Sequence, residues 1–216
     1  MIRLSKCIFT PFLLLLMTAC ASNTQLLSVE KEEGTAAPYK KVLVLAVSEN
    51  GQIRQVVEQG IADELSKAGI ESLVASLKMP GGLDKENPDD IRAPAEKVVK
   101  ESGVDSVLVA VLVQEEMRQE YEPPTREYVA VANVPYFMGY GAYVGYHYQT
   151  VYTPGYITEE QNYFVQSSLF DATNGKRVWS AQSKTMNPAG VQEGVEGFSA
   201  LVVGRLLSDS KLTKRK

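Results

Sequence analysis

The stretch Val42-Leu43-Val44-Leu45-Ala46-Val47 decides the fold, because it is an unbroken apolar run that is too short for a helix. It is rich in β-branched residues, and such a run is typical of a strand that is buried on both faces. Residues 107–113 repeat this pattern farther along the chain. The sequence therefore predicts two buried strands at the centre of a sheet.

Between these two runs, apolar residues recur at helical spacing. Six of them predict a first helix: Ile53, Val56, Val57, Ile61, Leu65 and Ala68. Gly69 is expected at the C-cap of this helix. A short strand is expected at 72–77. A second helix is expected between Pro94, at its first helical position, and Gly103. This β-α-β-α-β series indicates a layered α/β core.

The second half of the chain predicts further strands, at 127–134, 163–170 and 177–184. Asn174-Gly175 joins the last two as a hairpin, because both residues tolerate positive φ. Trp179 lies on the last strand and is expected to be buried.

A closing helix is expected from the apolar residues Val191, Val195, Phe198, Leu201, Val202 and Leu206. The predicted fold class is therefore α+β, a mixed β-sheet with about three helices packed mainly on one face. A long Tyr/Gly-rich β-hairpin or loop insertion, residues 122–161, is added to this core.

An export signal precedes the predicted domain. Arg3 and Lys6 supply positive charge, residues 8–17 are apolar, and the small residues Thr18-Ala19 come directly before Cys20. The apolar run is about half the ~20 residues that a membrane-spanning helix needs. A cleaved secretory signal is therefore favoured over a transmembrane anchor.

Cys20 gives this signal a more specific character. Its context resembles the lipobox of bacterial lipoproteins, with Met17 where leucine is usual. The resemblance implies that Cys20 becomes the first residue and carries the acyl chains that hold the protein to a membrane. Ala21 and Ser22 follow in place of an inner-membrane aspartate, which implies an outer-membrane, periplasm-facing location. A cleaved signal whose cysteine is incidental is the alternative.

These features divide the chain into a signal peptide (1–19), lipidated Cys20 with a flexible tether (20–38), a single domain (39–212) and a basic tail (213–216). Lys211 is expected to join Lys214, Arg215 and Lys216 as a solvated end. Removal of the signal changes the net charge from −4 to −6, which argues against nucleic-acid binding. The only other cysteine, Cys7, lies in the signal, which excludes disulfides and cysteine catalysis in the mature chain.

The insertion is compositionally unusual, since eight of the eleven tyrosines fall within 136–163, interleaved with glycines. Tyrosine combines a flat apolar face with a hydroxyl group and is enriched at recognition surfaces. The candidate binding residues are Tyr136, Tyr140, Tyr143, Tyr146, Tyr148 and Tyr152. They would contact a protein edge, a glycan or the membrane interface. A hairpin tip whose tyrosines pack on each other is the equal alternative.

Candidates for catalysis or metal binding are weak. His147 is the sole histidine and has no ligand-spacing motif around it, so neither a metal nor a cofactor is expected. Glu115, Glu116 and Glu120 could act as paired carboxylates, but strand alternation points Glu115 and Glu116 to opposite faces. They are therefore interpreted as a charged strand end that enters the long hairpin. The acidic residues of 84–90 are expected to form a solvated loop that starts the next helix. No nucleophile motif is present in the sequence.

The segment Phe170-Asp171-Ala172-Thr173-Asn174-Gly175-Lys176-Arg177-Val178-Trp179-Ser180, followed by a final helix, resembles a broad group of envelope lipoproteins. This group includes lipoproteins with a Tyr/Gly-rich insertion and, more distantly, the curli-secretion channel lipoprotein and the lipoprotein activators of penicillin-binding proteins. The resemblance implies a non-catalytic binding or assembly module with an envelope protein or glycan partner. A structural surface or matrix component, and an envelope glycan- or lipid-processing enzyme, are the alternatives.

Overall fold

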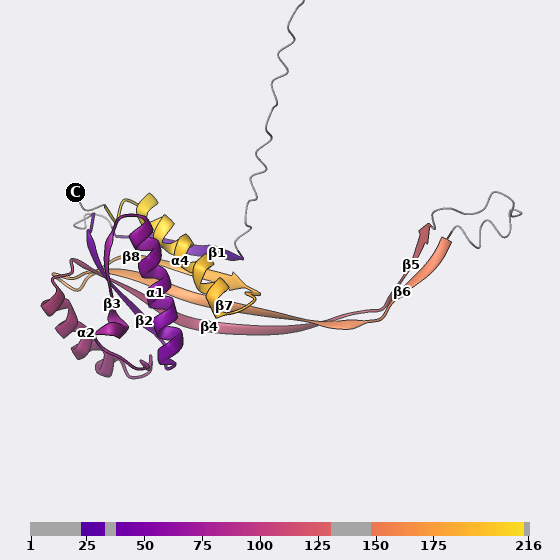
Figure 1. Ribbon diagram of the computed structural model, residues 1–216, viewed down its shortest axis with the longest axis horizontal. Helices are drawn as coiled ribbons and strands as arrows, with labels where there is room; N and C mark the ends of the chain where they lie inside the picture. Colours follow the sequence, from indigo (N-terminus) through magenta and orange to yellow (C-terminus); the bar gives the residue numbers. More distant parts are fainter. Residues whose placement is uncertain (1–22, 33–37, 131–147, 214–216) are drawn as a thin grey trace, which may run out of the picture.

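The computed structural model describes residues 23–32, 38–130 and 148–213. Its elements, in chain order, are β1 (Thr24–Lys31), β2 (Lys41–Val47), α1 (Gly51–Lys67), β3 (Glu71–Val74), the 3₁₀ turn η1 (Ala75–Leu77), α2 (Pro88–Ser102), β4 (Ser106–Glu122), β5 (Thr125–Ala130), β6 (Tyr148–Thr153), β7 (Tyr156–Asp171), β8 (Arg177–Met186) and α4 (Val191–Ser208). The helices and most of the strands form one body, from which a strand pair extends as a long arm (Figure 1).

Six strands form one sheet in the order β1-β8-β7-β4-β2-β3, and β5 and β6 form a separate two-stranded sheet. β2 is parallel to both β3 and β4. The strands β4, β7, β8 and β1 pair antiparallel in succession. The sheet is mixed, and the described residues contain three α-helices, so the predicted α+β class is confirmed.

The apolar run of β2 lies between β3 and β4 and is buried on both faces, as predicted. Val42 and Val44 point into the cluster that contacts α1 and α4, whereas Leu43 and Leu45 point into the cluster beneath α2. The alternation of the strand therefore supplies two separate cores, one on each side of the sheet.

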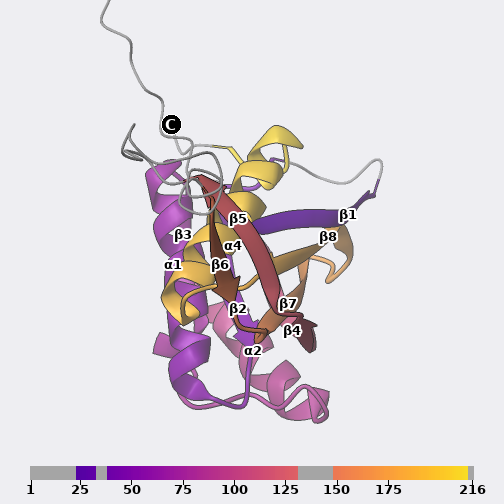
Figure 2. The ribbon, with the colours of Figure 1, turned by 90° about the vertical axis from the view of Figure 1, so that its right-hand side faces the viewer.

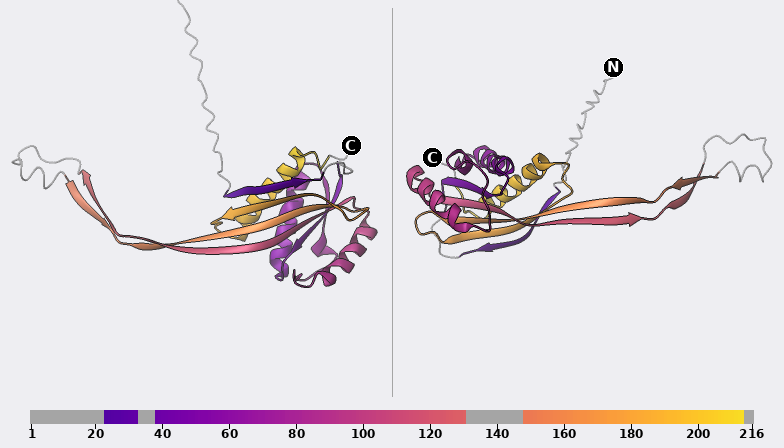
Figure 3. Two further views of the ribbon diagram at one scale, coloured as in Figure 1. Left: turned by 180° about the vertical axis from the view of Figure 1, so that it is seen from behind. Right: turned by 90° about the horizontal axis from the view of Figure 1, so that it is seen from below.

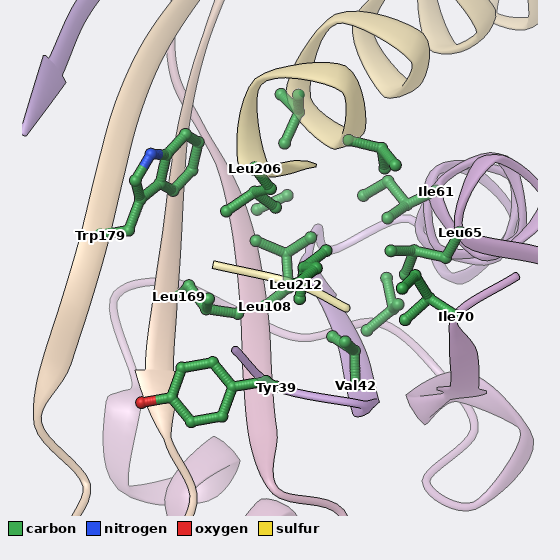
Figure 4. Close-up of a cluster of buried hydrophobic side chains, with 14 of the residues drawn as sticks. Tyr39, Val42, Ile61, Leu65, Ile70, Leu108, Leu169, Trp179, Leu206 and Leu212 are labelled. Carbon is green, nitrogen blue, oxygen red and sulfur yellow. The ribbon is translucent and has the colours of Figure 1, made fainter. Parts of the chain in front are cut away.

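Helices α1 and α4 lie side by side on one face of the sheet (Figure 2). They approach closely at Gly60, where an added Cβ would lie 2.4 Å from Cγ1 of Val195. Between the helices and the strands lies the larger core cluster, which includes Leu108, Leu169 and Trp179 (Figure 4). Trp179 is only 1% exposed, so its predicted burial is confirmed.

Helix α2 covers part of the opposite face through Val98, so two of the three helices share a face. The predicted start of this helix at Pro94 is wrong, because α2 begins at Pro88 and contains Pro94 in its interior. Pro88 occupies a first-turn position, and Asp89 and Asp90 favour that turn through the helix dipole, as the acidic loop suggested. Gly103 ends the helix in the left-handed conformation.

Ile53 is one of the apolar residues that predicted the first helix, but it is exposed, and the neighbouring Arg54 and Glu58 are fully buried. These two side chains form an ion pair with a 2.9 Å separation between Arg54 Nε and Glu58 Oε1. Glu58 also accepts hydrogen bonds from the backbone N–H groups of Ala46 and Ser76. The carboxylate therefore holds η1 against the end of β2, which explains why the strand predicted for 72–77 ends at Val74.

The prediction of a flexible tether over 20–38 is wrong for 24–31, which form the edge strand β1 paired with β8. Leu26 and Val29 of this strand pack against the larger core cluster. A register shift between Leu26 and Ser28 separates these two residues by three positions. This bulge removes the period of two by which a strand is recognised in a sequence.

The hairpin predicted at Asn174-Gly175 is confirmed and joins β7 to β8, with Gly175 at φ +67°. The chain end returns to the body, since Tyr39 forms an isolated parallel bridge with Leu212. The expectation that Lys211 is part of a solvated tail is wrong, because Lys211 is buried and its Nζ donates to the backbone oxygen of Glu32. Residues 214–216 lie outside the described part of the chain.

Candidate functional site

A two-stranded arm is the most distinctive feature of the structure. β4 and β7 pair along their whole length, but β2 pairs with β4 only as far as Val111, and β8 pairs with β7 only as far as Asn162. Beyond these points the two strands continue as a ribbon, which β5 and β6 extend. We call residues 115–130 and 148–163 the β-arm (Figure 1, Figure 3). At about 3.3 Å per residue, each strand side of the β-arm is about 50 Å long.

The β-arm bends at one level in both strands. Pro123 and Pro124 separate β4 from β5, and Pro154 and Gly155 separate β6 from β7. Proline has no backbone N–H group to donate to a strand ladder, so the pairing is interrupted at this point. The aromatic ring of Tyr121 lies over Gly155, where an added Cβ would be 2.5 Å from the Tyr121 hydroxyl oxygen. The sequence thus builds an elbow into the arm.

One face of the inner β-arm, which is the part between the body and the elbow (residues 115–122 and 156–163), carries exposed apolar side chains. Met117, Tyr121 and Ile157 are 62%, 64% and 63% exposed, and Tyr121 is directly opposite Ile157 in the register. Ile157 lies an even number of residues from Val165, which packs against the cluster under α1 and α4. Alternation along β7 therefore places Met117, Tyr121 and Ile157, here called the apolar face, on the same side of the sheet as these helices.

The opposite, charged face of the inner β-arm bears five ionised side chains: Glu116, Arg118, Glu120, Glu122 and Glu160. Arg118 pairs with Glu116 at 2.7 Å. The apolar face has only two carboxylates, and each accepts a hydrogen bond of 2.7 Å from a glutamine, Glu115 from Gln161 and Glu159 from Gln119. The β-arm as a whole contains seven glutamates and two arginines, so it is acidic and amphipathic.

Most of the residues predicted as sites cannot be placed. Cys20, Tyr136, Tyr140, Tyr143 and Tyr146 lie outside the described residues, and for Tyr148 only its backbone position at the start of β6 is described. Tyr152 is exposed on β6, and the guanidinium of Arg126 on the facing strand lies 5.9 Å from its ring centroid. His147 also lies outside the described residues. The two ends of the Tyr-rich stretch are thus attached to the outer end of the β-arm.

The carboxylates considered for acid-base chemistry do not converge. Glu115 and Glu116 alternate along β4 and point to opposite faces, as predicted. Within the ranges that the structure describes, no group of three or more His, Cys, Asp or Glu side chains is arranged to hold a metal ion. A depression of about 280 Å³ at the β3 edge is lined by Lys41, Glu71 and Glu101, among others. Lys41 and Glu71 form an ion pair there at 3.3 Å.

Two buried carboxylates in the body have structural roles. Asp209 accepts hydrogen bonds from Trp179 and Arg205 and forms an ion pair with Lys31. Burial acts to raise the pKa of Asp209, but the hydrogen bonds from Lys31, Trp179 and Arg205 outweigh it and lower that pKa. The network joins β1, β8 and the end of α4.

Asp171 occupies the turn between β7 and β8. A hydrogen bond from the Thr173 hydroxyl is the main reason why the pKa of Asp171 is lowered. Asp171 also accepts from the hydroxyl of Tyr39, and burial together with this hydrogen bond raises the pKa of Tyr39 to about 12. These groups fasten the hairpin to the body and leave the β-arm as the candidate interaction surface.

Among the described residues, none of the helices is both long enough and apolar enough to cross a membrane. No protein-family model matches the chain, and no curated protein sequence matches it.

Solved structures that resemble the chain include a PelC dodecamer from Paraburkholderia phytofirmans, at 17% identity and a TM-score of 0.45, over 87% of this chain and 99% of that one. Lipoprotein GNA1162 from Neisseria meningitidis aligns at 16% identity and a TM-score of 0.41, over 79% and 99% of the two chains. At these low values the functional argument rests on the residues of the chain itself. The resemblance to curli-secretion and penicillin-binding-protein-activator lipoproteins stays a prediction.

Proposed function

We propose that the protein is a non-catalytic lipoprotein of the cell envelope that acts as a binding or assembly module. It is anchored through Cys20 to the periplasmic face of the outer membrane. Its β-arm presents the Tyr/Gly-rich stretch to an envelope protein or glycan.

The β-arm is the observation that supports this proposal. An isolated two-stranded ribbon is marginally stable in water, and it exposes unpaired backbone groups along both edges. Six of the twelve large hydrophobic side chains that are exposed among the described residues lie on the β-arm. Such a concentration on one projecting element supports an interaction site, because the packing of the body does not require it.

The position of the tyrosines strengthens this argument. From Tyr128 to Thr158 the sequence contains no Asp, Glu, Lys or Arg, whereas the inner β-arm is acidic. The chain therefore carries an uncharged, aromatic stretch whose two ends are attached to the outer end of the β-arm.

A shortened arm tests the proposal. Replacement of 123–155 by Asn-Gly closes Glu122 onto Tyr156 through a two-residue turn that suits a hairpin. The expected result is an unchanged thermal midpoint together with loss of the partner recovered by crosslinking in intact cells. Undiminished recovery from the shortened-arm protein would overturn the proposal.

Two further variants separate the parts of the proposal. The combined variant Tyr136→Ser, Tyr140→Ser, Tyr143→Ser and Tyr146→Ser keeps the length of the chain. We expect it to reduce recovery of the crosslinked partner, whereas the control Lys176→Ala in the body should leave this recovery unchanged. Cys20→Ser is expected to abolish fatty-acid labelling. Equal labelling of the wild type and Cys20→Ser would contradict the anchor.

A further inference from the structure

The amino-terminal end of the described body lies at the root of the β-arm. Thr24, the first residue of β1, pairs with Thr185, and Thr185 pairs on its other side with Tyr163. The backbone oxygen of Asn23 accepts from the N–H group of Met186, the last residue of β8. The chain therefore enters the body at the level where the β-arm leaves it.

The direction of β1 also places the start of this strand at the root of the β-arm. β1 is antiparallel to β8, and β8 runs from the Asp171 turn toward the root of the β-arm. β1 therefore begins on the side of the body from which the β-arm projects. Cys20 precedes Asn23 by three residues, which span at most about 11 Å when fully extended. A lipid on Cys20 consequently holds the root of the β-arm close to the bilayer surface.

The apolar face of the β-arm has the chemistry that a lipid surface requires. Met117, Tyr121 and Ile157 project from one face, while four of the six glutamates of the inner β-arm lie on the other. The first residue of α4, Val191, is exposed on the same side of the sheet as the apolar face. An amphipathic element beside a lipid anchor buries its apolar side in the interface and keeps its charges in water.

We propose that the β-arm lies against the lipid surface to which Cys20 is anchored, with Met117, Tyr121 and Ile157 in contact with the lipids. The proposal rests on the anchor of the proposed function. It gives the protein a fixed orientation, in which the charged face of the arm is turned toward water and the outer end of the β-arm, to which the Tyr/Gly-rich stretch is attached, lies along the membrane.

Site-directed fluorescence tests this orientation in the acylated protein. The thiol of Cys20 is consumed by the anchor, so Ile157→Cys supplies the single site for an NBD label. Thr158→Cys, one residue away on the charged face, is the matched control. Met117→Cys and Arg118→Cys form a second pair on the facing strand. The vesicles contain phosphatidylethanolamine with a minor share of phosphatidylglycerol, with or without a lipid-borne quencher.

The expected result is a blue-shifted emission and a several-fold greater quenching at 157 and 117 than at 158 and 118. Water-like emission at all four sites, from protein that floats with the vesicles, would overturn the membrane contact and leave the anchor intact. An apolar face that docks on a protein or a second copy would give this outcome. Protein that does not float with the vesicles would overturn the anchor, and the membrane contact with it.

Discussion

The body segment of β4 (106–111) and its arm segment (114–122) belong to one continuous strand but have different neighbours. Residues 106–111 lie between β2 and β7 and alternate between buried and half-buried positions. Residues 114–122 pair with β7 alone and are almost all exposed. The body segment reads Ser-Val-Leu-Val-Ala-Val, whereas the arm segment consists mainly of Gln, Glu and Arg. The residue types that fill a core end at the point where the neighbouring strand ends.

This difference indicates that different interactions stabilise the two segments of the strand. The body is stabilised by apolar burial in two clusters, and its inner strands are held on both edges. The β-arm has only cross-strand pairs, such as Tyr121 with Ile157, and its attachment to the body. Substitutions in the body should therefore change the free energy of unfolding, and substitutions in the β-arm should change binding.

The largest expected effect separates two aromatic residues. Trp179→Ala should lower the free energy of unfolding by about 3–5 kcal/mol, because the indole is buried in the larger core cluster. Tyr121→Ala in the β-arm should change it by less than about 0.5 kcal/mol, because the ring is mainly exposed. Chemical denaturation of both variants measures the difference. Equal losses would mean that the β-arm is part of the cooperative unit.

An intermediate effect is expected at Asp209, and it should depend on pH. Asp209→Asn should cost about 2 kcal/mol at neutral pH, through weaker hydrogen bonds to Trp179 and to the partly exposed Lys31 and Arg205. The folded-state pKa of Asp209 lies below its unfolded value of about 3.9. Its stabilising contribution is therefore present above about pH 4 and is lost as the pH falls through the folded-state pKa.

Denaturation of the wild type and Asp209→Asn at neutral pH and near pH 2.5 measures this change. The gap between the two proteins should narrow in acid, because the wild-type carboxylate becomes protonated. Glu116→Gln, which breaks an exposed ion pair in the β-arm, is the control and should show no gap at either pH. A gap that widens in acid would contradict the lowered pKa of Asp209.

The smallest expected effect is local. Gly155→Ala should displace the Tyr121 ring, since the new methyl group would lie 2.5 Å from its hydroxyl oxygen. The free energy of unfolding should change by less than about 0.5 kcal/mol, because the elbow lies outside the body. Amide chemical shifts should change around 121–122 and 153–157 alone. In a Tyr121→Ala background these shifts should be smaller, and equal shifts would show that the ring does not lie over Gly155.

Much of the fold could be predicted from the sequence where one local signal dominates. The apolar run of β2 and the Asn174-Gly175 turn each specify their element without help from distant residues. β1 could not be predicted, because its bulge between Leu26 and Ser28 removes the alternation. The buried Arg54–Glu58 pair was also missed, since charged residues at an i, i+4 spacing are typical of an exposed helix face.

The composition of the chain predicted where the candidate site ends, but not how far the β-arm extends or which side chains share a face. The Tyr/Gly-rich stretch marked the outer end of the β-arm, and its glutamates were interpreted as a charged strand end. The apolar face was not predicted, because Met117 and Tyr121 lie on β4 and Ile157 on β7, and only the register brings them together. The paired signals Pro123-Pro124 and Pro154-Gly155 were visible in the sequence and could have located the elbow.

Amide hydrogen exchange along β4 tests most directly whether the body segment and the arm segment of this strand differ in stability. The amides of 107–111 should exchange only through global unfolding, because neighbouring strands hold both edges. The amides of 117–121 should exchange many-fold faster, including those bonded across the ribbon to β7, and the shortened-arm protein should leave the rates of 107–111 unchanged. Uniform protection from 107 to 121 would contradict the account, because it would make the β-arm an integral part of the folded body.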